Sequence, residues 1–287
     1  MCWFSVSPIE NDTTLHVYFS RAVSTSLNSL TCLIMPNVSA NISVGKPAVF
    51  ILNEFDVLHF ESAEDLSGTR VVSDNKVAVV AGAKRIPTEN GIKGMVEQIP
   101  PTKKWGSSFV FAPSGRCQAG DIVKMITQAP NTLISITGFS PFIVAENGTA
   151  VERRIDWGMY SMIEASKPIL VLQIVGAELY NDTCSPTTGP TIVLVPDIAH
   201  WTNGTAVLPN EYFKNVVVIA SSSLVILSSG RAVNTSNFSV PHSSHKVITL
   251  LSQSETVDEI KTSGAYALIR DGAFLLAADW STNDEVL

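Results

Sequence analysis

The chain has 287 residues, a net charge of -7, 45% apolar residues and only 16% charged residues. This balance excludes an intrinsically disordered chain, and the lack of Lys and Arg clusters excludes a nucleic-acid surface. The longest apolar run, 168–177, contains Gln173 and is too short to span a membrane. No secretory signal is readable at the N-terminus, so we expect a secreted protein to carry this sequence as part of a larger chain.

Short runs of Val, Ile, Leu and Phe, broken by Gly, Pro, Asn or Ser, predict strands along the whole chain and no convincing helix. In the first third, a glycine-led strand at 68–72 leads to a hydrophobic strand at 76–81. In the middle, 122–127 and 132–137 flank a turn and predict a hairpin. Further on, the glycine-led element recurs as 158–163 followed by 167–173.

The last third repeats both patterns. The runs 216–219 and 224–227 predict a second hairpin, and 264–269 followed by 273–278 predicts a third glycine-led element. A proline-led turn that ends in Trp105 also returns 96 residues later, ending in Trp201. Such recurrence at a fixed spacing indicates internal repeats.

We therefore predict an all-β fold of three tandem β-sandwich-like repeats, each about 85–105 residues long. Their boundaries are placed at 1–105, 106–201 and 202–287. The alternative is a β-propeller in which each repeat supplies two blades.

Eight Asn-X-Ser/Thr acceptors indicate a glycosylated surface in the secretory pathway, although a Ser/Thr/Asn-rich composition also produces such triplets by chance. They begin at Asn11, Asn37, Asn41, Asn147, Asn181, Asn203, Asn234 and Asn237.

Four widely spaced cysteines without a C-x-x-C pair favour disulfides over a zinc site. Of the three possible pairings we favour Cys117 with Cys184 and Cys2 with Cys32, because each pair then lies within one repeat. The alternative is four free thiols in a reducing compartment.

Linked segments of the sequence resemble the N-terminal domain of the IgGFc-binding protein family. They are Glu64–Lys76, Val96–Pro101, Trp105-Gly106 with Phe109–Phe111, and Gly120–Ile122, and weaker similarity continues to about Trp280. The resemblance implies an extracellular module of mucus, matrix or bacterial surface proteins, associated in the family's namesake with the Fc part of immunoglobulin G. It implies no particular antibody-contacting residue. A loop at 84–94 lacks two cysteines that similar proteins carry, which puts the rigidity of that loop in doubt.

Catalytic and cofactor motifs are not found: no nucleophile elbow and no phosphate-binding glycine loop occurs. The pair His242 and His245 is interpreted as a solvated loop rather than a metal site. The acidic residues Glu64, Asp65, Asp121, Asp258 and Glu259 are interpreted as turn caps and surface charges rather than as a glycosidase pair.

The repeated aromatic residues are interpreted as core residues. Trp105 and Trp201 are expected to anchor adjacent repeats, with sugar stacking or partner anchoring as the alternative. Tyr160 and Tyr266 are expected in repeat cores, with their hydroxyls bonded to the backbone.

These observations predict a secreted, non-catalytic binding or scaffold module without a cofactor, whose partner is a protein such as an immunoglobulin Fc region or a glycan. The alternatives are a secreted glycan-active hydrolase, which needs two carboxylates in one cleft, and a purely structural matrix spacer.

Overall fold

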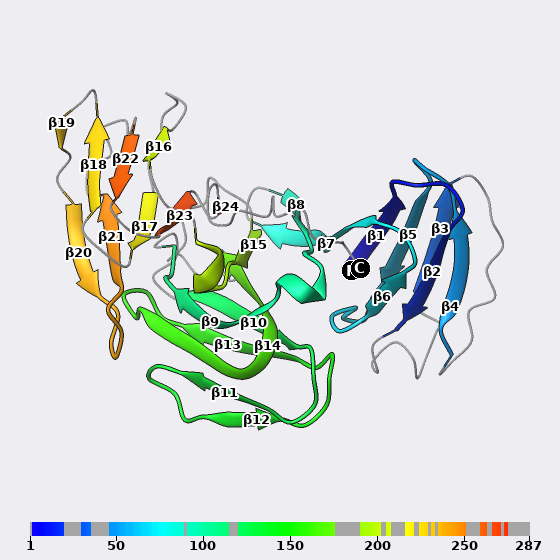
Figure 1. Cartoon of the computed structure of the whole chain (residues 1–287), viewed down its shortest axis with the longest axis horizontal. Coiled ribbons are helices and arrows are strands. Elements are labelled where there is room, and N and C mark those ends of the chain that lie inside the picture. Colours follow the sequence, from blue (N-terminus) through cyan, green and yellow to red (C-terminus); the bar gives the residue numbers. More distant parts are fainter. Residues whose placement is uncertain are drawn as a thin grey trace.

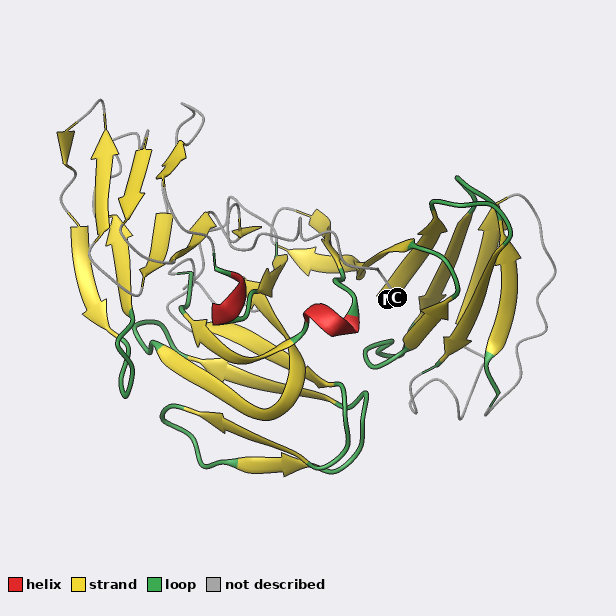
Figure 2. Ribbon diagram, in the orientation of Figure 1, coloured by secondary structure: helices red, strands yellow, loops and turns green. Residues whose placement is uncertain are grey.

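The structure is a computed structural model, and it describes residues 2–19, 30–35, 46–88, 91–114, 120–175, 190–201, 205–207, 216–220, 224–228, 231–232, 235–250, 259–262, 266–270 and 273–274. Every regular element in these ranges is a strand except two 3₁₀ turns, which confirms the all-β prediction (Figure 2). None of the helical segments in these ranges is long and apolar enough to cross a membrane.

Strands β1 to β8 form an N-terminal sandwich of two sheets, ordered β3-β5-β1-β7-β8 and β4-β2-β6 (Figure 1). Burial alternates along β1, β2, β4 and β5, because successive residues of a strand point to opposite faces. The inward set, which includes Phe4, Leu15, Phe50 and Phe60, fills the space between the sheets. The strands are β1 (Cys2–Pro8), β2 (Thr13–Tyr18), β3 (Leu30–Met35), β4 (Ala48–Leu52), β5 (Val57–Ser62), β6 (Arg70–Ser73), β7 (Val77–Thr88) and β8 (Gly91–Gln98).

Strands β9 to β15 form one curved central sheet, ordered β12-β11-β14-β10-β13, in which β9 and β15 also pair with β14. The 15-residue strand β14 shifts register between Glu164 and Ile169. Figure 1 shows the strand as strongly curved. Phe109, Phe111 and Met125 are among the buried residues of its core. The strands are β9 (Gly106–Phe111), β10 (Asp121–Thr127), β11 (Thr132–Ile136), β12 (Phe142–Val144), β13 (Ala150–Ile155), β14 (Ser161–Val175) and β15 (Thr191–Val195).

The remaining strands form two C-terminal sheets, ordered β16-β22-β18-β19 and β20-β21-β17-β23-β24. They lie on the far side of the central sheet from the N-terminal sandwich in Figure 1. The strands are β16 (Thr205–Val207), β17 (Val216–Ala220), β18 (Leu224–Ser228), β19 (Arg231–Ala232), β20 (Thr235–Ser239), β21 (Lys246–Leu250), β22 (Glu259–Thr262), β23 (Tyr266–Arg270) and β24 (Ala273–Phe274).

All three groups of strands share one pairing scheme. In the N-terminal sandwich, β1 pairs with β5 and β7, while β2 pairs with β4 and β6. In the central sheet, β10 pairs with β13 and the second half of β14, while β11 pairs with β12 and the first half of β14. In the C-terminal sheets, β17 pairs with β21 and β23, while β18 pairs with β19 and β22. The single strand β14 therefore takes the places of β6 and β7 together.

The two predicted hairpins are wrong in their pairing, although strands lie at both places. β10 and β11 are separated by β14, and β17 and β18 belong to different sheets. The connections from β1 to β2 and from β10 to β11 join strands that do not pair with each other, and we call these two connections arches. The predicted equivalence of the three glycine-led elements is also wrong for the third one. Its first strand, β23, pairs with β17 as β7 pairs with β1. β23 therefore corresponds to β7, which is the second strand of the first glycine-led element.

The arches before β2 and β11 have the same local geometry. Thr13 Oγ1 donates a hydrogen bond to the carbonyl three residues earlier at 2.7 Å, and Thr132 Oγ1 does the same at 2.7 Å. Asp12 and Asn131, the residues just before them, both have positive φ angles, of 54° and 53°. Asp and Asn tolerate this left-handed conformation better than other side chains, so both sequences suit the same arch.

The repeat boundaries at 105 and 201 stay a prediction, and each sheet draws its strands from only one of the three predicted repeats. The propeller alternative is not confirmed, because the sheets have five, seven, four, five and three strands rather than recurring four-stranded blades.

Candidate functional site

The segment Glu64–Lys76 contains residues that attach the N-terminal sandwich to the central sheet. Lys124 of β10 has a side chain that is only 10% exposed, and its Nζ lies 2.7 Å from Asp65 Oδ2 and 3.1 Å from Glu152 Oε1. Asp65 precedes β6, whereas Glu152 lies on β13, so the one ammonium group joins the two bodies. This arrangement is an ion-pair junction.

Burial and pairing act in opposite directions on the charges of this junction. Burial alone lowers the pKa of Lys124, but the hydrogen bond and charge of Asp65, followed by the charge of Glu152, outweigh it and raise the pKa. Burial likewise raises the pKa of Asp65, but its hydrogen bond to Lys124 outweighs this and lowers the pKa. Lys124 and Asp65 are therefore held in their charged forms near neutral pH.

Two backbone contacts reinforce the same junction. Gly68 has a φ of +85°, and a Cβ there would lie 1.7 Å from the carbonyl oxygen of Gly148. Glu97, within the segment Val96–Pro101, accepts a hydrogen bond from the backbone N–H of Leu194 on β15 at 3.1 Å. The residues that carry the sequence resemblance thus have a structural role, because they fix the position of the N-terminal sandwich.

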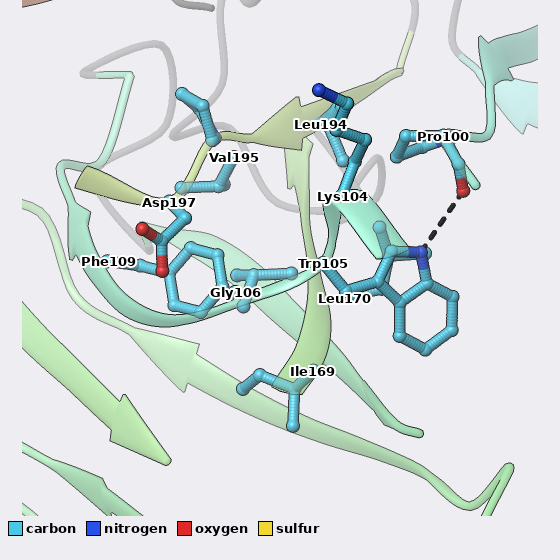
Figure 3. A pocket seen from close by; sticks show the side chains of 12 residues that line it. Pro100, Lys104, Trp105, Gly106, Phe109, Ile169, Leu170, Leu194, Val195 and Asp197 are labelled. Carbon is cyan, nitrogen blue, oxygen red and sulfur yellow. Dashed lines mark hydrogen bonds between the residues drawn. The ribbon is translucent and has the colours of Figure 1, made fainter. Parts of the chain in front are cut away.

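Trp105 lines a shallow, partly open pocket that Leu194 also borders (Figure 3). Its indole Nε1 donates to the carbonyl of Pro100 at 3.1 Å, and its ring packs beside Leu170. The indole is only partly buried, so it is both a packing residue and a partly accessible aromatic surface. The pocket is lined by Pro100, Lys104, Trp105, Gly106, Phe109, Ile169, Leu170, Val171, Leu194, Val195, Pro196 and Asp197.

Asp197 closes the other side of this pocket and is 7% exposed. Its Oδ2 accepts the backbone N–H groups of Ser107 and Ser108 at 2.7 and 2.8 Å, and its Oδ1 accepts that of Ala199 at 2.7 Å. Gly106 leaves room for the carboxylate, because a Cβ there would lie 2.0 Å from Oδ2. One side chain therefore ties the end of β15 to the start of β9.

The prediction that Trp201 anchors adjacent repeats is confirmed. Trp201 is 7% exposed and packs in one cluster with Val110 of the central sheet and Ile219 and Val247 of the C-terminal sheets. It follows a 3₁₀ turn, Ile198–His200, just as Trp105 follows the turn Thr102–Lys104. The proline-led repeat thus has the same local structure twice.

Tyr160 and His245 lie beside Trp201 or its cluster, where the central sheet meets the C-terminal sheets. The Tyr160 ring lies 5.1 Å from the ring of Phe238, but its hydroxyl has no hydrogen-bond partner among the described residues, so the predicted backbone bond is not formed. His245 lies 5.2 Å from Trp201, edge to face, whereas His242 is exposed in the turn before β21. No group of three or more metal-binding side chains is present in the described ranges. The side chain of Tyr266 lies outside the described set.

The acidic residues weighed for glycoside cleavage have structural partners where they are described. Asp121 is 2% exposed and accepts the backbone N–H of Ser114 at 2.6 Å and the Gln173 side-chain amide at 2.7 Å. Asp65 is bound to Lys124, and the Glu64 backbone N–H is held by Ser62 Oγ at 3.0 Å. Asp258 and the side chain of Glu259 lie outside the described residues. Asp65 and Asp121 thus serve the fold.

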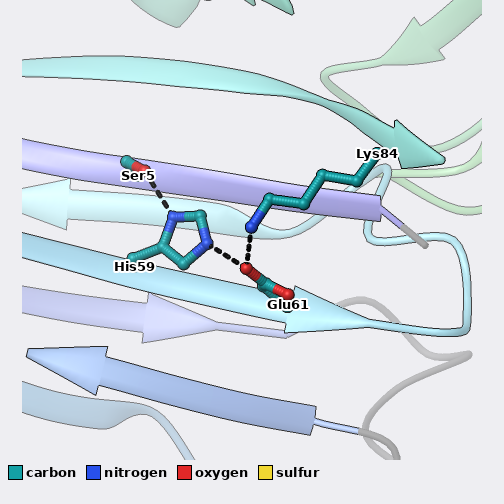
Figure 4. Close-up of polar contacts among 4 residues, drawn as sticks. All are labelled: Ser5, His59, Glu61 and Lys84. Atoms are coloured by element: carbon teal, nitrogen blue, oxygen red, sulfur yellow. Dashed lines mark hydrogen bonds and ion pairs between the residues drawn. The ribbon is translucent and has the colours of Figure 1, made fainter. Parts of the chain in front are cut away.

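A polar network lies on the outer face of the N-terminal five-stranded sheet, β3-β5-β1-β7-β8 (Figure 4). Ser5 Oγ lies 2.7 Å from His59 Nδ1, and His59 Nε2 lies 2.7 Å from Glu61 Oε1, which also pairs with Lys84. Hydrogen bonds from Lys84 and then from His59 hold the pKa of Glu61 below its usual value. The order Ser, His, Glu resembles a hydrolase triad, but β1 is hydrogen-bonded to β5 and β7 on both sides of Ser5. Its backbone N–H groups are therefore committed to the sheet and cannot form an oxyanion hole.

The outer face of the three-stranded sheet exposes apolar side chains. Val49 and Ile51 of β4 are 51% and 64% exposed, Val72 of β6 is 41% exposed, and Tyr18 of β2 is 37% exposed. Arg70 stacks on the Tyr18 ring at 4.4 Å from its centroid. We call these five residues the apolar face. Sequence reasoning missed it, because a continuous apolar run such as β4 is typical of a strand buried on both sides.

The predicted modification sites are only partly described. Asn11 and Asn147 are exposed in turns, and Asn237 lies on β20 with its side chain outside the described set. The other acceptors, Asn37, Asn41, Asn181, Asn203 and Asn234, lie outside the described residues, as do Cys117 and Cys184.

The predicted disulfide between Cys2 and Cys32 is not formed, because Cys2 is a free cysteine. Strands β1 and β3 lie on opposite sides of β5, with Cys2 opposite Ser62 and Cys32 opposite Phe60. Two strand spacings of about 4.8 Å exceed the Cα separation that a disulfide allows. Burial raises the pKa of the Cys2 thiol.

These features define a class of protein, an all-β module in which three groups of strands share one pairing scheme. Neighbouring groups are held together by contacts of Asp65, Gly68 and Trp201. The model of the family described as "IgGFc binding protein" matches residues 2–274, and the chain belongs to that family. The resemblance identified in the sequence is thereby confirmed. A human relative, "IgGFc-binding protein", is 28% identical over 152 residues, which cover 52% of this chain and 3% of the relative. No solved structure matches the chain.

Proposed function

We propose that this chain is an extracellular, non-catalytic module that binds a protein partner through the apolar face. The observation that carries the proposal is the exposure of Val49, Ile51 and Val72 on the outer face of the three-stranded sheet, where β4 and β6 flank the outward residues Thr14 and His16 of β2. Several exposed large apolar side chains on one sheet face mark a candidate protein-interaction surface. Family membership supports the same class of function, because the family is described by a binding activity.

The composition of the apolar face fits a protein interface. Aliphatic residues supply the area, while Tyr18 and Arg70 are of the residue types enriched where binding energy concentrates. The stacking of Arg70 on Tyr18 orients the guanidinium before a partner arrives, which lowers the entropy cost of binding. We infer a partner with an apolar patch and a carboxylate placed to meet Arg70.

The Fc part of immunoglobulin G is the first partner to test, because the family and the human relative carry it in their names. The chain spans only 3% of that relative's length, so its partner is proposed and not inherited. A secreted location, as a glycoprotein of mucus or matrix with a role in adhesion, belongs to the same proposal, and a glycan is the alternative ligand.

Binding to immobilised Fc tests the proposal, with wild type compared with Ile51→Lys. A lysine at position 51 of this face must lose its hydration on binding, so we expect Kd to rise by at least about tenfold. Ile143→Lys is the matched control, because Ile143 is 67% exposed on β12 and Ile51 is 64% exposed on β4. Equal weakening by both variants would contradict the location of the site. Absence of wild-type binding would remove Fc as the partner.

A further inference from the structure

Phe55 is the most exposed large apolar side chain described, at 84%. It lies in the turn between β4 and β5 with a φ of 68°, in the left-handed region that bulky residues rarely adopt. At the corresponding connection of the central sheet, between β12 and β13, the residue with positive φ is Gly148, at 67°. A phenylalanine held in that conformation and left in water adds strain without contributing to the core, so the reason for its position lies outside the core.

The turn that carries Phe55 is held by hydrogen bonds within itself and by one from the neighbouring β1–β2 arch. Within it, the Asn53 backbone N–H donates to Asp56 Oδ2 at 2.7 Å, and the Asp56 N–H donates to the Asn53 carbonyl at 3.0 Å. From the β1–β2 arch, Asn11 Oδ1 accepts the backbone N–H of Glu54 at 3.1 Å. The side-chain amide of Asn11 is therefore fixed next to the residue that precedes Phe55.

Asn11 begins an Asn-Asp-Thr acceptor for N-linked glycosylation and is exposed. Its Oδ1 is engaged by Glu54, but its Nδ2, the atom that carries a glycan, has no hydrogen-bond partner among the described residues. The hydrogen bond at Oδ1 also restricts rotation of the amide and so restricts the direction in which an attached sugar extends.

We propose that Phe55 is the stacking platform for the first N-acetylglucosamine of a glycan on Asn11. The C1–N bond forms at Asn11 Nδ2 as the oligosaccharide leaves its lipid diphosphate donor, and Nδ2 loses one proton. One face of the pyranose ring carries mainly C–H groups, and it covers the Phe55 ring by apolar contact. The proposal rests on the extracellular location proposed above, and it identifies what covers this side chain.

Ile9, the residue just after β1, is another exposed apolar side chain on the arch that bears Asn11, at 55%. The sugar has an advantage over a separate partner, because it is attached within the same pair of turns. Its effective concentration at Phe55 is high whether or not another protein is bound.

A double-mutant cycle on protein secreted from eukaryotic cells tests the stacking. The four proteins are wild type, Asn11→Gln, Phe55→Ala and the double variant, and occupancy of Asn11 is measured by mass spectrometry of the peptide. We expect Phe55→Ala to lower the folding equilibrium constant, measured by urea unfolding. The decrease should be about three- to tenfold larger when Asn11 is glycosylated than in the Asn11→Gln background.

Asn147 provides the matched control, because it is an exposed acceptor in a turn whose next residue is Gly148. Asn147→Gln should leave the effect of Phe55→Ala unchanged. An unoccupied Asn11, or a coupling below about 1.5-fold with Asn11 occupied, overturns the proposal. So does a loss of partner binding in Phe55→Ala without coupling, which would assign Phe55 to a protein interface. If none of the eight acceptors is occupied, the extracellular location itself fails; lack of Fc binding with a coupled Asn11 would refute only the proposed partner.

Discussion

Asp197→Ala should be among the most destabilising single changes in the central sheet. The carboxylate is 7% exposed and accepts three backbone N–H groups at 2.7 to 2.8 Å. Each hydrogen bond to a charged acceptor contributes roughly 1.5–3 kcal/mol, but the three share one side chain and are not additive. Because the Ala199 N–H lies in a short turn where water can replace the acceptor, we expect a loss of about 3 kcal/mol.

Urea unfolding followed by tryptophan fluorescence measures this loss, since Trp105 and Trp201 follow the two 3₁₀ turns of this region. Circular dichroism as a second probe shows whether the central sheet unfolds with the rest of the chain. Asp197→Asn keeps one acceptor oxygen and should lose about half as much. Asp156→Ala, at an exposed aspartate, should change stability by less than about 0.5 kcal/mol. A loss in Asp197→Ala no larger than in Asp156→Ala would refute the reasoning.

Two further predictions concern the junctions. Gly68→Ala should cost more than about 2 kcal/mol in urea unfolding because its Cβ overlaps the Gly148 carbonyl, whereas Gly158→Ala, with the same φ of +85° but nothing within 4 Å, should cost only about 1–2 kcal/mol; equal losses would contradict the contact. Burial lowers the pKa of His245 below 6.5, so the unfolded chain binds the proton first, and the stability present above pH 6.5 is lost as the pH falls toward the lower folded pKa. His245→Phe should flatten the dependence of the urea midpoint on pH in this range, and an unchanged dependence would show that His245 is not its source.

The sequence predicted where strands lie better than how they pair. Apolar runs such as 122–127 and 216–219 locate β10 and β17, because a strand must bury one face wherever it pairs. The partner of a strand depends on whether the next turn is a hairpin or an arch, and both kinds of turn use the same residue types. The repeated Trp105 and Trp201 could be recognised because a 3₁₀ turn and its tryptophan are local features.

The candidate sites were less predictable, because each depends on contacts between distant strands. The resemblance located Asp65 and Gly68, but only the structure shows that they meet Lys124 and Gly148. Cys2 and Cys32 look suited to a disulfide by their spacing, yet β5 lies between their strands. No sequence pattern distinguishes a strand with one exposed apolar face from one buried on both.

The strand β14 makes the central sheet indivisible. Strands β9, β10, β11 and β15 all hydrogen-bond to it, and among the described strands β12 and β13 pair only with β11 and β10. Local opening of an outer strand leaves the rest of the sheet intact, but β14 cannot detach without breaking all four pairings. Its amide protons should therefore exchange with solvent deuterium among the slowest in the chain and at one common rate, which makes this strand an internal reporter of cooperative opening.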